Sequence, residues 1–186
     1  MKEMINNIDP SKEFPVESIK DYIDALGNKN GLIRKQARIA LVNMGEPVID
    51  VLAELTIHPQ VIVRWEAVKA LSQINSPLTA PILINSLEDD YEGVRWLAAD
   101  GLITLGKNGL IAILEALSSY RISVLLREGA HHVLNELSKS FPMTGIRELV
   151  EYLEHNTEYL RIPIHSRSLL KKLIHTMDDP RKKSLH

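Results

Sequence analysis

Hydrophobic residues along the chain recur in one pattern four times. Each copy has an apolar residue, an arginine, two variable residues, an alanine, two more variable residues, a small or apolar residue and a leucine. The copies span residues 33–41, 63–71, 94–102 and 126–134. Their arginines are Arg34, Arg64, Arg95 and Arg127, which lie 30, 31 and 32 residues apart. A nearly constant spacing of this length indicates a protein built from repeats.

A second apolar segment lies between successive copies, at residues 48–55, 80–87 and 110–117, and related segments occupy residues 16–26 and 146–153. Their apolar residues have helical spacing, as in Val48, Val51, Leu52 and Leu55. Glycine, proline and other turn-forming residues separate the segments. Each repeat is therefore predicted to be two antiparallel helices. Neither helix buries its apolar face alone, so the repeats must stack.

The pattern predicts an all-α fold, an alpha solenoid of about five helix pairs. We expect one domain over residues 13–177, with repeats at roughly 13–44, 46–74, 77–105, 108–139 and 142–177. The fifth pair is predicted to be a degenerate C-terminal cap, because Arg161 lacks the alanine and leucine that should follow it. Residues 1–12 and 178–186 are expected to be flexible. The core stripe of the second repeat is predicted to be Val63, Ala67, Ala70, Leu71 and Ile74.

The Val-Arg-x-x-Ala-x-x-Ala-Leu run, with the turn Asp89-Asp90 before one copy of it, resembles the HEAT-repeat superfamily. It is most similar to the short bacterial repeats of phycobilisome lyase-like proteins. The resemblance covers residues 14–138 well and 142–177 loosely. It implies a right-handed α-α superhelix whose second helices line a concave face, and it says little about function.

The resemblance also implies a ladder in which an acidic residue of the turn inside each repeat pairs with the motif arginine. Six residues before the four arginines stand Asn28, His58, Asp89 and Arg121. Asp89 alone fits this scheme fully. We therefore expect the ladder to be interrupted at His58 and at Arg121.

Two tryptophans occupy equivalent positions of the second helices, on the face opposite the core: Trp65 and Trp96. Aromatic residues make up only 5% of the chain, so this pair is the strongest indication of a binding surface. The alternative is that both rings pack across the neighbouring helix. Charges around the pair run from basic to acidic and would orient a bound peptide. The candidate partner-binding residues are Lys35, Trp65, Lys69, Trp96, Asp100, Glu128, His132 and Glu136.

Composition limits the possible functions further. The chain has 186 residues, no cysteine, a formal charge of −2 and a pI of about 6.4. Without cysteine there is no disulfide, thiol nucleophile or cysteine-based metal site, and the charge disfavours nucleic-acid binding. No apolar segment is long enough to be a signal peptide or a membrane span. We expect a cytoplasmic binding module with a protein or peptide partner, and no membrane, cofactor or catalytic residue.

Three chemical alternatives are weaker. Glu128, His132 and Glu136 share a helix face at metal-binding spacing, but no second helix offers matching ligands, and a solvated polar face is favoured over a metal site. A bilin lyase or chromophore chaperone would cradle a tetrapyrrole with Trp65, Trp96 and His132. An alkylpurine DNA glycosylase would use Trp96 and Asp100, although the low pI disfavours affinity for DNA.

Overall fold

The computed structural model describes residues 18–119, 121–155 and 160–178. Within these residues the chain forms α-helices and two short 3-10 helices, and no strand. The helices are α1 Ile19–Ala25, α2 Gly31–Met44, η2 Glu46–Val48, α3 Ile49–Leu55, α4 Val61–Ile74, η3 Pro77–Thr79, α5 Ala80–Ser86, α6 Glu92–Thr104, α7 Lys107–Leu117, α8 Val124–Ser140, α9 Ile146–Glu154 and α10 Arg161–Asp178.

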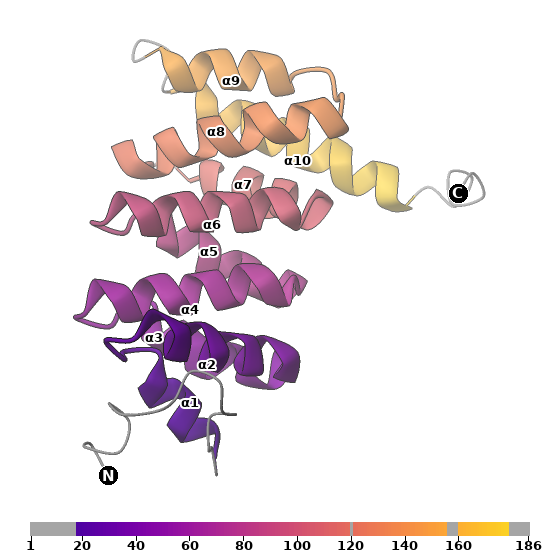
Figure 1. Ribbon diagram of the computed structural model, residues 1–186. Helices are drawn as coiled ribbons and strands as arrows, with labels where there is room; N and C mark the ends of the chain where they lie inside the picture. Colours follow the sequence, from indigo (N-terminus) through magenta and orange to yellow (C-terminus); the bar gives the residue numbers. More distant parts are fainter. Residues whose placement is uncertain (1–17, 120, 156–159, 179–186) are drawn as a thin grey trace.

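The helices stack in two layers (Figure 1). Helices α2, α4, α6 and α8 carry the arginine motif and contact one another in succession; we call them the second-helix layer. Each packs against the first helix of its own repeat, namely α1, α3, α5 or α7. The predicted all-α solenoid is therefore confirmed. None of the helices in the described residues is long and apolar enough to cross a bilayer.

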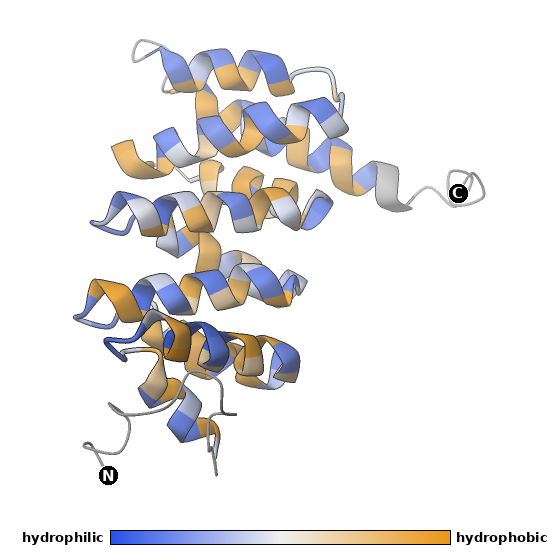
Figure 2. Cartoon of the chain, in the orientation of Figure 1, coloured by the Kyte–Doolittle hydropathy of each residue, from blue (hydrophilic) through white to orange (hydrophobic). Residues whose placement is uncertain are grey.

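The core lies between the two layers and consists of the motif positions. The motif leucines Leu41, Leu71, Leu102 and Leu134 are fully buried, as are the motif alanines Ala37, Ala67, Ala98 and Ala130. The small alanines let successive helices pack closely. Figure 2 shows hydrophilic and hydrophobic residues alternating around the helices, which matches this one-sided burial.

Local signals explain where the helices begin and end. The side chains of Asn30 and Ser123 accept hydrogen bonds from the first turns of α2 and α8. Pro47 and Pro77 lie in the first turns of the 3-10 helices, where a missing N–H costs little. Gly45 has a φ of 71° at the end of α2, a left-handed conformation that favours glycine.

The fifth helix pair exchanges the two layers, which the sequence pattern does not predict. In the regular order α9 would pack on α7. Instead α9 packs on α8, and α10 packs on α7 and α9 (Figure 1). A His131–Glu154 contact of 2.9 Å joins α8 to α9, and Arg167 donates a 2.7 Å hydrogen bond to the Ser118 carbonyl at the end of α7. The reversed pair thereby covers the last apolar face of each layer.

The arginine ladder differs from the predicted scheme in which each arginine pairs with an acid of its own turn. Within a repeat the arginine instead donates a hydrogen bond to the backbone carbonyl six residues earlier. The acceptor is Asn28 for Arg34 (2.8 Å), His58 for Arg64 (3.1 Å) and Asp89 for Arg95 (2.8 Å). Every residue type offers this carbonyl. The expected interruption at His58 is therefore wrong.

Carboxylates reach the arginines from the following repeat. Arg34 donates to Glu66 at 3.1 Å, and Arg64 forms two hydrogen bonds with Asp89, at 2.7 and 3.0 Å. Arg95 has no such partner in the described residues, because the following repeat offers Arg121 where Asp89 would be. Within the described residues the ladder thus continues past His58 and is interrupted at Arg95.

Asp89 gives this ladder a pH dependence. Burial alone would raise the pKa of its carboxyl, but hydrogen bonds from Arg64 and the Tyr91 backbone together hold the pKa below its usual value of 3.8. The same Asp89 hydrogen bond raises the pKa of Arg64, against a smaller lowering by burial. A depressed carboxyl pKa stabilises the fold above the unfolded-state pKa, and this stabilisation is lost as the pH falls through the folded-state pKa.

We expect Asp89→Asn to lower the free energy of unfolding by about 1.5–3 kcal/mol at neutral pH. The deficit should shrink as the pH falls below about 4, where wild-type Asp89 also becomes protonated. Urea unfolding of both proteins along a pH series measures it. Asp24→Asn, at an exposed position of α1, is the control. A deficit that stays constant down to acid pH would contradict the ion pair.

Candidate binding face

The second-helix layer presents all eight candidate residues, but the structure divides them among several places. Trp96, Glu128 and His132 line one hollow, between α6 and α8. Trp65 lies elsewhere, in a hollow with Arg34, Val61, Ile62 and Tyr91. The two tryptophans therefore line different hollows.

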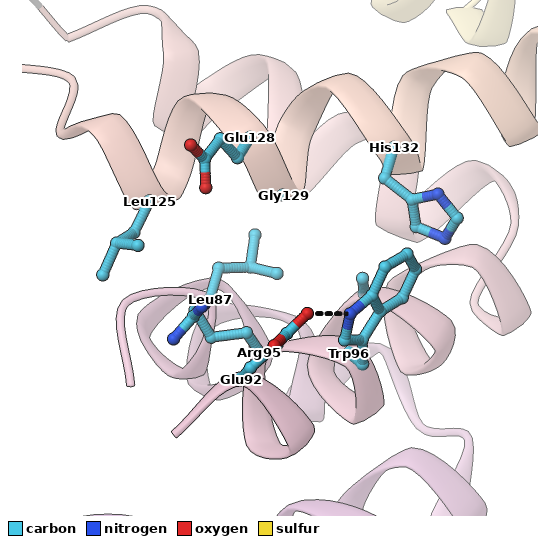
Figure 3. A pocket seen from close by; sticks show the side chains of 9 residues that line it. Leu87, Glu92, Arg95, Trp96, Leu125, Glu128, Gly129 and His132 are labelled. Carbon is cyan, nitrogen blue, oxygen red and sulfur yellow. Dashed lines mark hydrogen bonds between the residues drawn. The ribbon is translucent and has the colours of Figure 1, made fainter. Parts of the chain in front are cut away.

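The hollow between α6 and α8 has a volume of about 140 Å³ (Figure 3). Its apolar lining comes from the end of α5 and from the facing sides of α6 and α8, while two glutamates and an arginine add charge. We call it the Trp96 hollow; its lining residues are Leu87, Glu92, Arg95, Trp96, Ala99, Leu125, Glu128, Gly129 and His132. Drug-sized ligands fill about 300 Å³ or more, so this volume suits a single side chain.

Trp96 is half exposed, at 49%, and yet fixed in position. Its indole N–H donates to the Glu92 carboxylate one turn earlier on α6, at 3.2 Å (Figure 3). On α8, the His132 ring meets the indole with centroids 4.5 Å apart and an interplanar angle of 72°. An exposed aromatic ring held by two neighbours loses little conformational entropy when a partner covers it.

The close approach of Gly129 on α8 to Leu87, which directly follows α5, forms one wall of the hollow. A Cβ on Gly129 would lie 2.9 Å from a methyl carbon of Leu87, so a larger residue would need that side chain to move. In Figure 3 Leu87 lies beneath Gly129, with Glu128 and His132 on either side. Glycine at this position lets α8 approach while its neighbours face the opening.

Trp65 has a more structural setting than Trp96. It is half buried and packs against the core. The ammonium group of Lys69, one turn later on α4, lies 4.3 Å from the centroid of its ring, a cation–π contact. Lys69 thus already occupies the position over the Trp65 ring that a cation of a partner could take.

The remaining candidates line neither of the hollows that hold a tryptophan. Asp100 lines an open hollow of about 530 Å³ across the C-terminal halves of α2, α4 and α6. Glu136 accepts hydrogen bonds from Lys139 at 2.7 and 2.8 Å, which hold the pKa of its carboxyl below the usual value. Lys35 is exposed on α2.

Several residues of the Trp96 hollow were not predicted from the sequence. Glu92 stands four residues before Trp96, a readable spacing for a contact on one helix. No spacing in the sequence points to Leu87, Leu125 and Gly129, because the contact between them depends on how α8 lies relative to the end of α5. The buried carboxylate of Glu66 was also missed, since it occupies a variable position of the motif.

Comparison with known families gives one match. The family model for HEAT repeats matches residues 19–103 and, overlapping, residues 49–135. Among curated proteins no match was found. The matched residues cover more than half of the 186-residue chain and include all four copies of the arginine motif. The chain belongs to the HEAT-repeat family.

Proposed function

We propose that the protein is a non-catalytic binding module that holds a segment of a partner protein against the second-helix layer, with Trp96 as the main anchor. The half-exposed and immobilised indole beside a side-chain-sized hollow carries this proposal. Binding hot spots are enriched in tryptophan, and hydrophobic pockets at their centre exclude water. HEAT repeats are commonly protein-interaction scaffolds, which agrees with this role.

The setting of each tryptophan refines their expected roles. Lys69 and the core already contact Trp65, so we assign this ring mainly to packing. Trp96 keeps half of its surface for a partner. The charge change along the layer, from Lys35 to Glu128, would orient the bound segment.

Other features remain predictions from the sequence. These are the short repeat type of phycobilisome lyase-like proteins, a bacterial source, the cytoplasmic location and the division into five repeats over residues 13–177. No contact in the described residues favours the tetrapyrrole or DNA alternatives over a protein partner.

Panning a library of linear peptides on the full-length protein tests the proposal. For selected peptides, Trp96→Ala should weaken binding at least about tenfold, or about 1.4 kcal/mol, because the anchor is lost. Fluorescence anisotropy with synthetic peptides measures the affinities.

Leu78→Ala is the matched control, since Leu78 is an exposed apolar residue on η3, and it should leave the affinities unchanged. Circular dichroism melting should show both variants folded. If every selected peptide binds Trp96→Ala as tightly as it binds wild type, the second-helix layer is not anchored at Trp96 and the proposal fails.

A further inference from the structure

We infer that the Trp96 hollow takes a basic side chain, lysine or arginine, of the partner segment. This inference rests on the proposed function and specifies which chemistry the anchor recognises. It follows from a comparison of two equivalent tryptophans within the chain and from the charges around the hollow.

The second repeat supplies a cation to its own tryptophan, whereas the third repeat does not. Lys69 follows Trp65 by four residues and places its ammonium group 4.3 Å from the ring centroid. The residue four after Trp96 is Asp100, an acid. In the part of the chain that the structure describes, no lysine or arginine lies over Trp96, whose ring contact is with His132. The place that Lys69 fills on one ring is thus left for a partner on the other.

The charges beside Trp96 favour the same occupant. Glu92 and Glu128 both line the hollow, and their carboxylates are exposed. Figure 3 shows the Glu128 side chain on α8, on the side of Leu125, and the Glu92 carboxylate beside the indole. No hydrogen bond or ion pair is made by the Glu128 side chain within the described residues, so it can accept a donor from a partner.

The nearby arginine does not neutralise these carboxylates. Arg95 directs one nitrogen to the carbonyl oxygens of Asp89 and Asp90, at 2.8 and 3.3 Å. Both aspartate carboxylates contact Arg64. The two arginines and two aspartates of this turn therefore balance in formal charge. Among the residues that line the hollow, Glu92 and Glu128 carry carboxylates with no lysine or arginine partner in the described residues, and these carboxylates attract a cation.

The shape of the hollow also suits a long basic side chain. Its volume of about 140 Å³ is enough for one side chain, and Leu87, Ala99 and Leu125 offer apolar contact to the methylene stem. The charged end would then lie between the indole and the two carboxylates. Cation–π attraction and charge-assisted hydrogen bonds would act on the same group.

The test uses peptides selected on the full-length protein whose binding depends on Trp96. We expect these peptides to be enriched in arginine or lysine at one position. Replacing that arginine by citrulline keeps its shape and removes its charge, and replacing that lysine by norleucine keeps the methylene stem and removes the ammonium group. Wild-type affinity should then fall about tenfold. Against Glu128→Gln the same replacement should cost distinctly less, because one of the carboxylates is already absent.

A second variant transfers the arrangement of the second repeat to the third. Asp100→Lys places a lysine four residues after Trp96, as Lys69 follows Trp65, and should weaken binding of the basic peptide about tenfold. Asp24→Lys makes the same change of charge on α1 and should have little effect. Circular dichroism checks that each variant is folded.

The outcomes separate this inference from the proposed function. Trp96-dependent peptides that have no basic residue, or that tolerate the neutral replacement, would overturn the basic side chain and leave the binding role in place. Equal losses in wild type and Glu128→Gln, or equal effects of Asp100→Lys and Asp24→Lys, would also overturn it. If no selected peptide depends on Trp96, the proposed function itself fails.

Discussion

Replacing Glu66 with leucine should lower the free energy of unfolding by about 3–5 kcal/mol, because it leaves a buried arginine without its counter-charge. Glu66 accepts hydrogen bonds from Arg34 at 3.1 Å and from Arg38 at 2.6 Å, across the contact between α2 and α4. The side chains of Glu66 and Arg38 are 3% and 8% exposed, so water cannot replace the lost carboxylate. Urea unfolding followed by circular dichroism measures the change.

A second substitution distinguishes the lost charge pair from a packing defect. Glu66→Leu combined with Arg38→Leu removes the two most buried of the three charges, and we expect it to be less destabilising than Glu66→Leu alone. Glu54→Leu, at an exposed position of α3, should change the stability by no more than about 0.5 kcal/mol. If the double variant loses as much as the two single variants together, the cost is one of packing.

Replacing Leu71 with alanine should cost about 2–5 kcal/mol, since it removes buried methyl groups and leaves a cavity. Leu71 is fully buried in α4, at a motif position that recurs in every regular repeat. Neighbouring helices are held apart by other side chains and cannot fully close the gap. The fall in the urea midpoint, at an unchanged slope, measures this cost.

Leu78→Ala makes the same chemical change at a residue that is 60% exposed, and should have a small effect. Because both variants replace leucine by alanine, the difference between their losses of stability reports the effect of burial alone. A loss at Leu71 no larger than that at Leu78 would contradict the assignment of the motif leucines to the core.

The spacing of apolar residues along the sequence was enough to predict the regular part of the fold. Val63, Ala67, Ala70 and Leu71, expected on one face of a helix, are all buried, and Ile74 is partly buried. This success has a local cause. Which residues share a helix face depends on the helical period, and a repeated face can be covered only by the next copy.

The ion pairs could not be predicted from the sequence because they join residues of different repeats. Asp89 was expected to pair with Arg95 of its own repeat, but its carboxylate binds Arg64 of the preceding repeat. A spacing of six residues identifies the turn, whereas the reach of a long side chain across a helix interface depends on how the repeats stack. The burial of Glu66 has the same origin.

The period along the chain thus determined the helices, the core positions and the equivalent places of Trp65 and Trp96 on successive second helices. Tertiary structure decided that Trp65 packs against the core, while Trp96 meets His132 of α8 and stands beside an open hollow. It also decided that α9 and α10 exchange layers at the end of the stack. The physical reason is that periodicity sets which side of a helix is buried, whereas side-chain partners depend on the distance and offset between helices that are far apart in sequence.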